Sequence, residues 1–350
     1  MEFASDNAGP AHPQVLEALI AANAGYAGGY GTDSVTEAVQ ARIRDIFEAP
    51  EAAVYLVGTG TAANALILAT LTNPWDTVFC TSMAHINEDE CNAPEFFTGG
   101  TKLTLVDDTD ARMDPEALRA AIATEESRGV HGPQRGPVSI TQVTERGTVY
   151  SLDQIRAITG IARDFGLKTH LDGARFANAL VALGCTPAEM TWKAGIDAVS
   201  FGGTKNGCLG VEACIFFDPA KAWEFELRRK RGAHLFSKHR YLAAQMQAYL
   251  QDDLWLNSAR AANAAAARLA DGFATHPEVT LAHPADANTV FARFPRHLHA
   301  KMLRAGVHYY VWDGDAFSGD PEEQLLGRFV LDWSADPAET DRFLELLAQG

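Results

Sequence analysis

The sequence lacks the features that direct a chain to a membrane or to an oxidising compartment. It has no run of about 18 apolar residues that could span a bilayer. Its start, MEFASDNAGP, lacks the charged and then apolar segments of a signal peptide. The five cysteines form no CxxC pair, so we expect reduced thiols and no metal site. These absences predict a cytoplasmic protein with no membrane partner.

Positive charge is also scarce. The chain has 29 lysines and arginines against 45 aspartates and glutamates, a formal net charge of −16. Nonspecific binding to nucleic acid or to an anionic membrane needs a basic face, so we expect neither as a partner. Its 350 residues, 47% hydrophobic and 21% charged, are typical of a globular protein with a large domain and a smaller one. Any anionic ligand must therefore be held by local donors.

Short apolar segments alternate with helical stretches through most of the chain. The predicted strands are Ala53–Val57, Thr77–Cys80, Lys102–Val106, Val138–Thr144, Lys168–Asp172, Ala198–Phe201 and Ala213–Phe217. The predicted helices are Pro13–Ala24, Val35–Phe47, Thr61–Leu71, Pro115–Thr124, Leu152–Phe165 and Arg175–Leu183. This alternation predicts an α/β fold with a mainly parallel sheet covered by helices.

The pattern changes from about Phe236, where Ala-rich helical sequence begins, above all at Ala259–Phe273. A strand-like segment, Phe329–Trp333, and a helix after Pro337 end the chain. Near the start, the glycine-rich Gly25–Thr32 (GYAGGYGT) cannot hold a helix and is predicted to be a loop. We therefore expect an N-terminal arm and loop (1–34), a large domain (35–240) and a smaller α+β domain (241–350).

A lysine follows one predicted strand in a glycine-flanked turn, AVSFGGTKNG, at Ala198–Gly207. Burying an unpaired ammonium group is costly. Desolvation also lowers the pKa of a lysine and leaves a nucleophilic amine, as in enzymes that form Schiff bases. Taken alone, the pattern favours a surface lysine just past a strand end. Lys205 becomes a candidate only together with other motifs.

A carboxylate ends another predicted strand, in KTHLDGAR. Asp172 would lie at the edge where open α/β sheets bind ligands. One use of a carboxylate there is to keep a pyridine nitrogen protonated, so that the ring can act as an electron sink. The alternative is that Asp172 caps the next helix.

Two weaker signals precede these residues. Gly58–Asn64, GTGTAAN, joins a strand to a helix, where backbone N–H groups and threonine hydroxyls suit a phosphate, although many such turns look alike. His85, in MAHINEDE, could stack on an aromatic ring or move a proton near neutral pH, although a lone histidine is more often structural. Together, the phosphate turn, histidine, aspartate and lysine supply what pyridoxal 5'-phosphate needs.

These motifs, DGAR and TKNG above all, resemble those of the low-specificity L-threonine aldolases, and most closely the branch that also takes phenylserine-like substrates. This family belongs to the aspartate-aminotransferase-like (fold type I) group of pyridoxal-phosphate enzymes, and the similarity covers essentially the whole chain. It implies retro-aldol cleavage of β-hydroxy-α-amino acids to glycine and an aldehyde. The alternatives are β-elimination or transamination on the same scaffold, or a non-catalytic binding module.

The resemblance also assigns cofactor roles. Lys205 would form the Schiff base, Asp172 would face the pyridine nitrogen, and His85 would stack on the ring. The implied phosphate ligands are Thr59, Gly60 and Thr61, with Lys230 or Arg231 coming from a neighbouring subunit.

The same resemblance assigns substrate roles. Ser5, in FASDN, would bind the substrate carboxylate together with Arg175, which would also contact the cofactor, and Arg328, in GRFVLDW. Tyr30 and Asp33, in GGYGTDS, would reach an active site at the interface of a homodimer or homotetramer.

Two positions depart from the pattern of many relatives. TQVTERG replaces a THN-like motif, so Glu145, or Gln142 by a shifted register, stands where a histidine lies near the substrate hydroxyl. Asp89 replaces an aromatic residue four positions after the stacking histidine. Both changes bear on substrate preference and leave the cofactor chemistry intact. His85 is the expected base for the β-hydroxyl, with Glu145 as the alternative.

Overall fold

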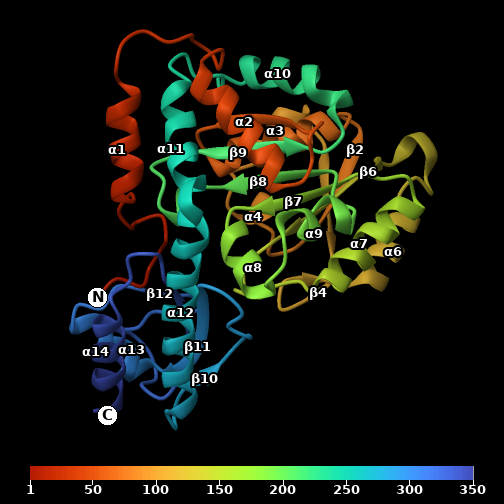
Figure 1. Cartoon of the computed structure of the whole chain (residues 1–350). Helices are drawn as coiled ribbons and strands as arrows, with labels where there is room; N and C mark the ends of the chain where they lie inside the picture. The colour runs from red at the N-terminus through yellow and green to blue at the C-terminus, as the bar shows by residue number, and fades with distance from the viewer. Residues whose placement is uncertain (350) are drawn as a thin grey trace.

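The computed structural model describes residues 1–349 as two main sheets connected by long helices, with a further two-stranded sheet of β4 (Asp108–Thr109) and β5 (Arg112–Met113) (Figure 1). The larger sheet has the strand order β1–β9–β8–β7–β6–β2–β3. Its strands are β1 (Ala53–Val57), β2 (Asp76–Thr81), β3 (Lys102–Val106), β6 (Gln134–Thr141), β7 (Thr169–Gly173), β8 (Ala198–Gly202) and β9 (Glu212–Phe216). Strand β9 is reversed relative to the rest of this sheet, since it pairs antiparallel with both β1 and β8. The expected mainly parallel sheet is confirmed.

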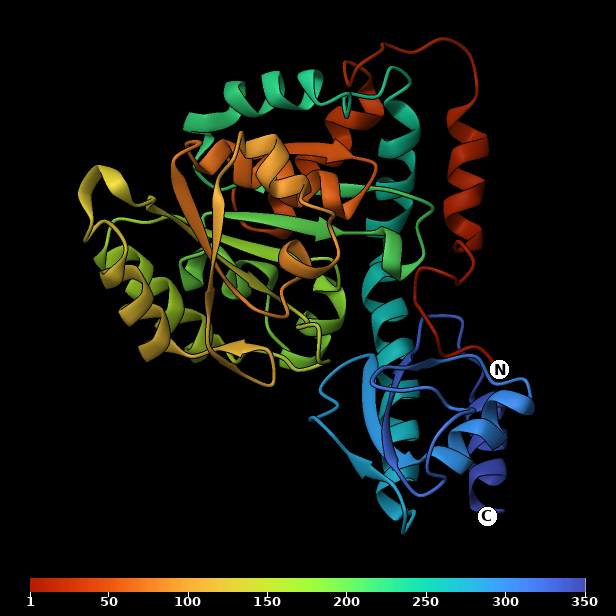
Figure 2. The ribbon, with the colours of Figure 1, turned by 180° about the vertical axis from the view of Figure 1, so that it is seen from behind.

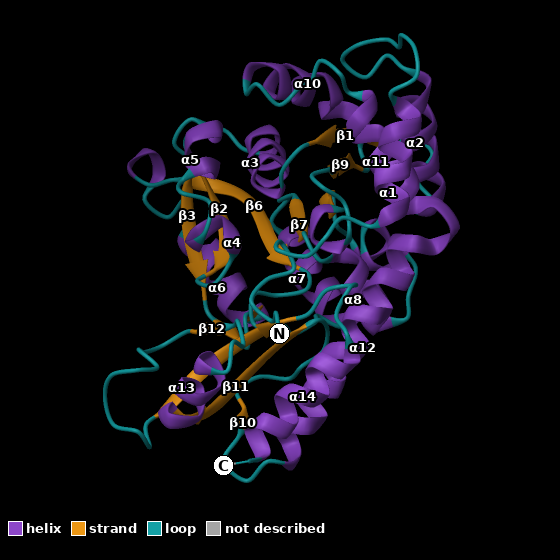
Figure 3. Cartoon of the chain, turned by 90° about the vertical axis from the view of Figure 1, so that its left-hand side faces the viewer, coloured by secondary structure: helices purple, strands orange, loops and turns teal. Residues whose placement is uncertain are grey.

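Helices cover both faces of this sheet (Figure 3). They include α2 (Ser34–Ile46), α3 (Gly60–Leu71), α4 (His85–Glu88), α5 (Ala93–Thr98), α6 (Pro115–Thr124), α7 (Leu152–Asp164), α8 (Phe176–Leu183), α9 (Pro187–Met190) and α10 (Ala222–Arg231). Their starts follow from local chemistry: Ser151 and Gln154 form a capping box on α7, and Pro115 opens α6 after the capping residue Asp114.

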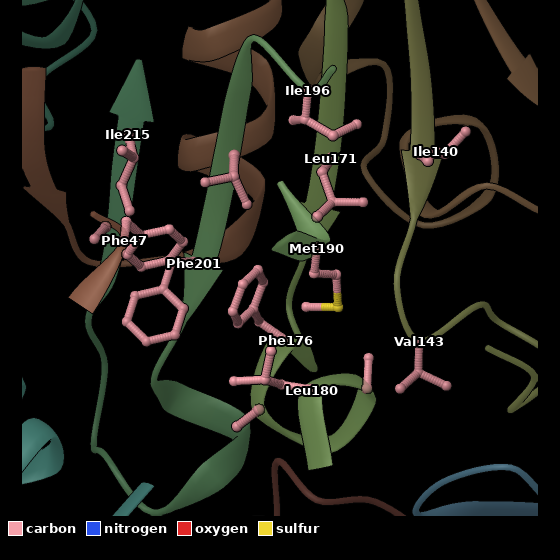
Figure 4. Packing of buried hydrophobic residues seen from close by; sticks show 14 of the residues in the cluster. Phe47, Ile140, Val143, Leu171, Phe176, Leu180, Met190, Ile196, Phe201 and Ile215 are labelled. Carbon is pink, nitrogen blue, oxygen red and sulfur yellow. The ribbon is translucent and has the colours of Figure 1, made fainter. Parts of the chain in front are cut away.

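Buried aromatic rings pack beside the central strand β8 (Figure 4). The ring of Phe201 lies 5.2 Å from that of Phe176 and 5.5 Å from that of Phe47, and all three side chains are fully buried. This packing fixes the end of β8, from which the chain turns into Thr204–Asn206.

Truncating Phe201 should therefore be costly. We expect Phe201→Ala to lower the free energy of unfolding by about 3–5 kcal/mol, because it opens a cavity that the packed core cannot close. Urea unfolding measures this loss. Phe96→Ala is the control, since that ring is 78% exposed, and an equal loss in both variants would contradict the packing described here.

The smaller sheet is antiparallel, with the order β10–β11–β13–β12. It comprises β10 (Thr280–Leu281), β11 (Thr289–Pro295), β12 (Tyr310–Val311) and β13 (Gln324–Val330), and it carries α13 (Arg296–Arg304) and α14 (Pro337–Ala348). The strand expected at Phe329–Trp333 begins earlier and ends at Val330, because Asp332 forms a local turn with Ser334.

The first residues belong to this smaller domain. Glu2 forms a bridge with His308, and the Phe3 ring packs at 5.5 Å from that of Phe343 and 6.4 Å from that of Phe329. Residues 1–34 were expected to form an arm and a loop, but the first of them pack into the smaller domain. This segment runs from the small sheet through α1 (Pro13–Ala22) to the predicted loop, which has no regular structure.

The two cores meet along the long helix α12 (Leu254–Thr275), which runs from the large domain to the small one (Figure 2). The core of the large sheet includes residues of α11 (Arg240–Leu250) and the start of α12, up to Ala259. Residues from Ala265 onward belong to the second core. The division between the two hydrophobic cores therefore lies within α12, later in the chain than the boundary expected at residue 240. The reason is that α11, which begins at residue 240, packs on α1 and α2 beside the large sheet.

Candidate active site

A cavity of about 350 Å³ opens at the carboxyl ends of β6, β7 and β8, beside the N-terminus of α3. The candidate residues that line it are Thr59, Gly60, Thr61, His85, Glu145, Asp172, Arg175 and Lys205. Segments far apart in the sequence therefore meet at one edge of the sheet, where open α/β folds bind ligands.

Lys205 lies in a short 3-10 turn directly after β8. The neighbouring Asn206 anchors this turn by donating to the Tyr249 hydroxyl and to the Trp255 carbonyl, both at 2.8 Å. Burial lowers the pKa of the Lys205 amine, and the charge of Arg175 lowers it further. A larger share of neutral, nucleophilic amine follows.

Asp172 ends β7 and is almost fully buried. Its Oδ2 accepts a hydrogen bond from Asn64 Nδ2 at 2.7 Å, and its Oδ1 accepts one from the Ala174 amide at 3.0 Å. Helix α8 has no side-chain cap, so Asp172 does not serve as one. Two fixed donors orient the carboxylate in the cavity that Lys205 also lines.

The N-terminus of α3 forms another wall. Thr59 caps this helix by accepting from the Ala62 amide at 3.1 Å. A Cβ added at Gly58 or Gly60 would meet no atom within 4 Å, so an anion can approach the backbone there closely. An amine, a carboxylate and an open helix N-terminus in one cavity fit the aldehyde, the pyridine nitrogen and the phosphate of pyridoxal phosphate.

Glu145 reaches the cavity because β6 ends at Thr141 and a turn follows, in which the Thr144 amide donates to Thr148 O. Glu145 Oε1 accepts from the His85 amide at 2.9 Å, while Oε2 has no partner among residues 1–349. Burial raises the pKa of Glu145 to about 7.

Gln142, the shifted-register alternative to Glu145, lies outside the cavity. It is fully buried, and its side chain donates to Tyr150 O and accepts from the Tyr150 amide, both at 2.9 Å. The structure therefore places Glu145, rather than Gln142, beside the other candidate residues.

The raised pKa of Glu145 has a consequence for stability. The folded protein keeps this proton up to about pH 7, whereas an unfolded glutamate loses it near 4.5, so this residue destabilises the fold as pH rises through that window. We expect Glu145→Gln to raise the free energy of unfolding by about 1–3 kcal/mol at pH 8 and to change little near pH 4. Urea unfolding at both pH values measures this, with the exposed Glu116→Gln as control. A gain that does not depend on pH would contradict the assignment.

Arg175 lines the cavity but is already paired, which the sequence did not suggest. Its Nε and Nη2 donate to the two carboxylate oxygens of Asp6, at 2.6 and 2.9 Å. Burial opposes ionisation of Asp6, but the charges of Arg175 and Lys205 hold its pKa below the usual value. The guanidinium is therefore oriented by the N-terminal segment.

The other expected carboxylate ligands lie on or beside that segment. Ser5 Oγ accepts from the Asn7 amide. Arg328 donates to the Ala4 carbonyl at 3.3 Å and lies 5.6 Å from the centre of the Trp312 ring. Burial lowers the pKa of Arg328 to about 10, and Arg175 adds to the shift. Neither Ser5 nor Arg328 lines the cavity itself.

The residues expected at an interface lie outside this cavity. Asp33 is a buried cap of α2 that accepts from the Thr36 amide. Tyr30 is half exposed, with Lys230 Nζ 4.7 Å from its ring centre. Arg231 lines a separate cavity between α5 and α10. Asp89, expected near the substrate rather than at an interface, also lies outside the cavity and is exposed just after α4.

Glu212, which no sequence motif singled out, also lines the cavity, at the start of β9. It accepts from the Gly203 amide at 2.9 Å and from the Thr204 hydroxyl at 2.6 Å, and burial raises its pKa to about 7. The sequence does contain a sign of this residue, because a glutamate near the start of the apolar run VEACIFF would be buried with the strand.

Two classes of feature are absent from residues 1–349. No group of three or more His, Cys, Asp or Glu side chains there could hold a metal ion. No helix in that range combines the length and the apolar character needed to cross a bilayer.

The large sheet is mainly parallel with β9 reversed, the smaller sheet is antiparallel, and a strand-end lysine and a strand-end carboxylate line one cavity. These features define a fold type I pyridoxal-phosphate enzyme. Residues 2–296 match the sequence model of the beta-eliminating lyase family. The chain is 39% identical over 335 residues to the low specificity L-threonine aldolase of Pseudomonas aeruginosa, covering 96% of this chain and 93% of that one. A second such aldolase, from a Pseudomonas species, is 38% identical over 337 residues, covering 96% and 94%. The chain therefore belongs to the beta-eliminating lyase family and, within it, to the low-specificity L-threonine aldolases, which are pyridoxal-phosphate-dependent lyases.

Solved structures agree with this assignment. The threonine aldolase of Leishmania major superposes with a TM-score of 0.92 at 26% identity, covering 99% of this chain and 98% of that one. A serine palmitoyltransferase from S. paucimobilis, solved with bound PLP–myriocin aldimine, gives a TM-score of 0.71 at 16% identity, covering 100% and 86%. The second likeness shows the fold alone. The expected family and the fold type I architecture are both confirmed.

Proposed function

We propose that this protein binds pyridoxal phosphate and cleaves the Cα–Cβ bond of β-hydroxy-α-amino acids, including L-threonine, L-allo-threonine and phenylserine-like substrates, to give glycine and an aldehyde. The observation that carries the proposal is the meeting of Lys205 and Asp172 in one cavity beside the open N-terminus of α3. The activity named for the two Pseudomonas relatives supports the choice of reaction.

Three groups of this chain would hold the cofactor. The backbone at Thr59–Thr61 and the threonine hydroxyls would bind its phosphate, Lys205 would bond its aldehyde carbon, and Asp172 would hold a proton on its ring nitrogen. When bound, pyridoxal phosphate supplies an electron sink for the bond that breaks. Since the chain carries a net charge of −16, the phosphate depends on these local donors.

Arg175 would bind the substrate carboxylate. Asp6 engages its Nε and Nη2, so Nη1 is left for a second carboxylate. A guanidinium that is already fixed by a second carboxylate orients its ligand better than a free one, because its side chain loses less conformational entropy on binding. Ser5 and Arg328, on and beside the same segment, would complete this anion site and fix the direction of the Cα–Cβ bond.

His85 would take the proton of the β-hydroxyl, and Glu145 is the second candidate. Both line the cavity, and Glu145 accepts from the His85 amide, so the two are held together. A positioned base typically contributes about 10²–10⁴-fold to a rate. Removing the true base should therefore slow turnover while the cofactor stays bound.

Product analysis tests the reaction directly. The pyridoxal-phosphate-loaded protein is incubated with L-threonine, L-allo-threonine and phenylserine, and the products are separated. Glycine plus an aldehyde supports the aldolase. A 2-oxo acid plus ammonia identifies a β-eliminating or deaminating enzyme instead, and failure to take up the cofactor identifies a binding module.

The proposal extends to a homodimer or homotetramer with active sites shared between subunits. Tyr30 and Lys230 lie outside this chain's own cavity but close to each other, which fits a role in a neighbouring site. We expect a sample that mixes Lys205→Ala and Lys230→Ala subunits, exchanged under mild denaturant, to recover part of the turnover that each variant lacks alone. Sedimentation of the wild type as a monomer would contradict the shared site.

A further inference from the structure

Glu90 is a buried carboxylate just past α4, and its side chain is fully enclosed. Its Oε1 accepts a hydrogen bond from Asn64 Nδ2 at 2.8 Å and lies within hydrogen-bonding distance of His85 Nδ1, also at 2.8 Å. Its Oε2 has no partner among residues 1–349. Burying a carboxylate is costly unless a donor or a cation compensates, and the His85 ring is its titratable partner.

Asn64, on α3, connects this carboxylate to the one that faces the cofactor site. Its Nδ2 donates to Glu90 Oε1 at 2.8 Å and to Asp172 Oδ2 at 2.7 Å. Its Oδ1 accepts from the Ser200 hydroxyl at 2.6 Å, which fixes the orientation of the amide. Both N–H bonds of one side chain are thereby directed at two carboxylates.

We propose that Glu90 is a positioning residue for His85. Its carboxylate holds the ring by Nδ1 and leaves Nε2 as the basic nitrogen of a ring that lines the cavity. The inference rests on the proposed aldolase function, because it assigns to Nε2 the proton of the substrate's β-hydroxyl. A carboxylate that fixes one imidazole tautomer in this way makes the opposite nitrogen the acceptor.

The charges around the ring agree with this role. The hydrogen bond to Glu90 raises the pKa of His85 and outweighs burial, which lowers it; Asp172 raises it further, and Lys205 lowers it. Glu145 faces the backbone of His85 rather than its ring. Removing the charge of Glu90 should therefore make Nε2 less basic and free the ring to turn.

The wild-type protein provides the first test. Long-range proton–nitrogen NMR spectra of the cofactor-free protein, with nitrogen-labelled histidine, report which ring nitrogen carries the proton. The His85 signals are identified by their loss in His85→Gln. We expect neutral His85 to carry its proton on Nδ1. A proton on Nε2 would overturn the proposal without any change at Glu90.

Glu90→Gln provides the second test, with Glu88→Gln as the matched control because Glu88 is an exposed carboxylate of α4. We expect the pKa of His85 to fall by about 1 unit or more in Glu90→Gln, as on losing a neighbouring opposite charge, and to stay unchanged in the control. Glu90→Asp, which keeps the charge, should retain most of the wild-type pKa. An unchanged pKa in folded Glu90→Gln would overturn the proposal.

The pH profile of the loaded enzyme separates positioning from packing. A base acts in its neutral form, so kcat/KM rises with pH through the pKa of His85. In Glu90→Gln this rise should move to lower pH, and the plateau should fall about tenfold or more. If Glu90 only supported packing, replacing it would lower the amount of folded protein but leave unchanged the pH at which kcat/KM rises. If the wild type cleaves no β-hydroxy-α-amino acid, the proposed function fails, whereas the NMR titration still decides whether Glu90 controls His85.

Discussion

Lys205→Ala should lower turnover by about 10⁴-fold or more, the upper end of what a single positioned group supplies. It should also remove the visible absorbance of pyridoxal phosphate bound to a lysine. The physical reason is that Lys205 is the lysine of the cavity, and its burial keeps a share of its amine neutral and nucleophilic. Absorbance and steady-state aldehyde release measure the two effects.

This loss should not reflect misfolding. The turn that carries Lys205 is held by Asn206 through Tyr249 and Trp255, contacts that the substitution leaves in place. Removing a buried amine should leave the free energy of unfolding of the cofactor-free protein unchanged or higher. Lys193→Ala, which removes an exposed lysine paired with Glu48, is the matched control. Wild-type absorbance in Lys205→Ala would contradict the assignment.

Asp172→Asn should lower turnover by about 10²–10³-fold, a loss typical of removing one preorganised electrostatic group. The reason is that a neutral amide cannot hold a proton on the pyridine nitrogen, so the ring accepts electrons less readily. Lys205 and the N-terminus of α3 remain, so the cofactor should still bind. Its affinity and absorbance report on binding, and aldehyde release reports on chemistry.

The substitution also disturbs a hydrogen bond, so a second variant is needed. In Asp172→Asn the introduced amide has one oxygen and one NH2 group in place of two oxygens. If its oxygen accepts from Asn64, its NH2 group is directed at the Ala174 amide, which is itself a donor. Asp172→Ala removes that conflict and should show a similar loss of turnover. Asp153→Asn, at an exposed ion pair with Arg156, should behave as wild type. Full turnover in Asp172→Ala would show that this carboxylate does not act on the cofactor.

Much of the larger domain follows from local sequence. Ala53–Val57 and Lys102–Val106 form the strands predicted for them, because short apolar runs between turn signals have few other ways to be buried. Asp172 and Lys205 could be singled out because each ends such a run. β6 ended earlier than predicted, at Thr141, because the turn at Thr144–Thr148 depends on hydrogen bonds that strand propensity does not encode.

The partners of these residues were not predictable in the same way. Asp6 reaches Arg175 across 169 positions, and Asn64 reaches Asp172 across 108. Neither spacing carries a periodic signal, since both contacts exist only once the sheet and the N-terminal segment are assembled. Glu90 lies only five positions after His85, yet their contact requires the chain to leave α4 in between.

One measurement tests the central claim most directly. The pyridoxal-phosphate-loaded protein is reduced with borohydride, which makes the bond between the cofactor and its amine permanent, then digested and analysed by mass spectrometry. We predict the pyridoxyl mass on the peptide that contains Lys205 and on no other. A modified peptide carrying a different lysine, or full incorporation with Lys205 left free, would contradict the site described here.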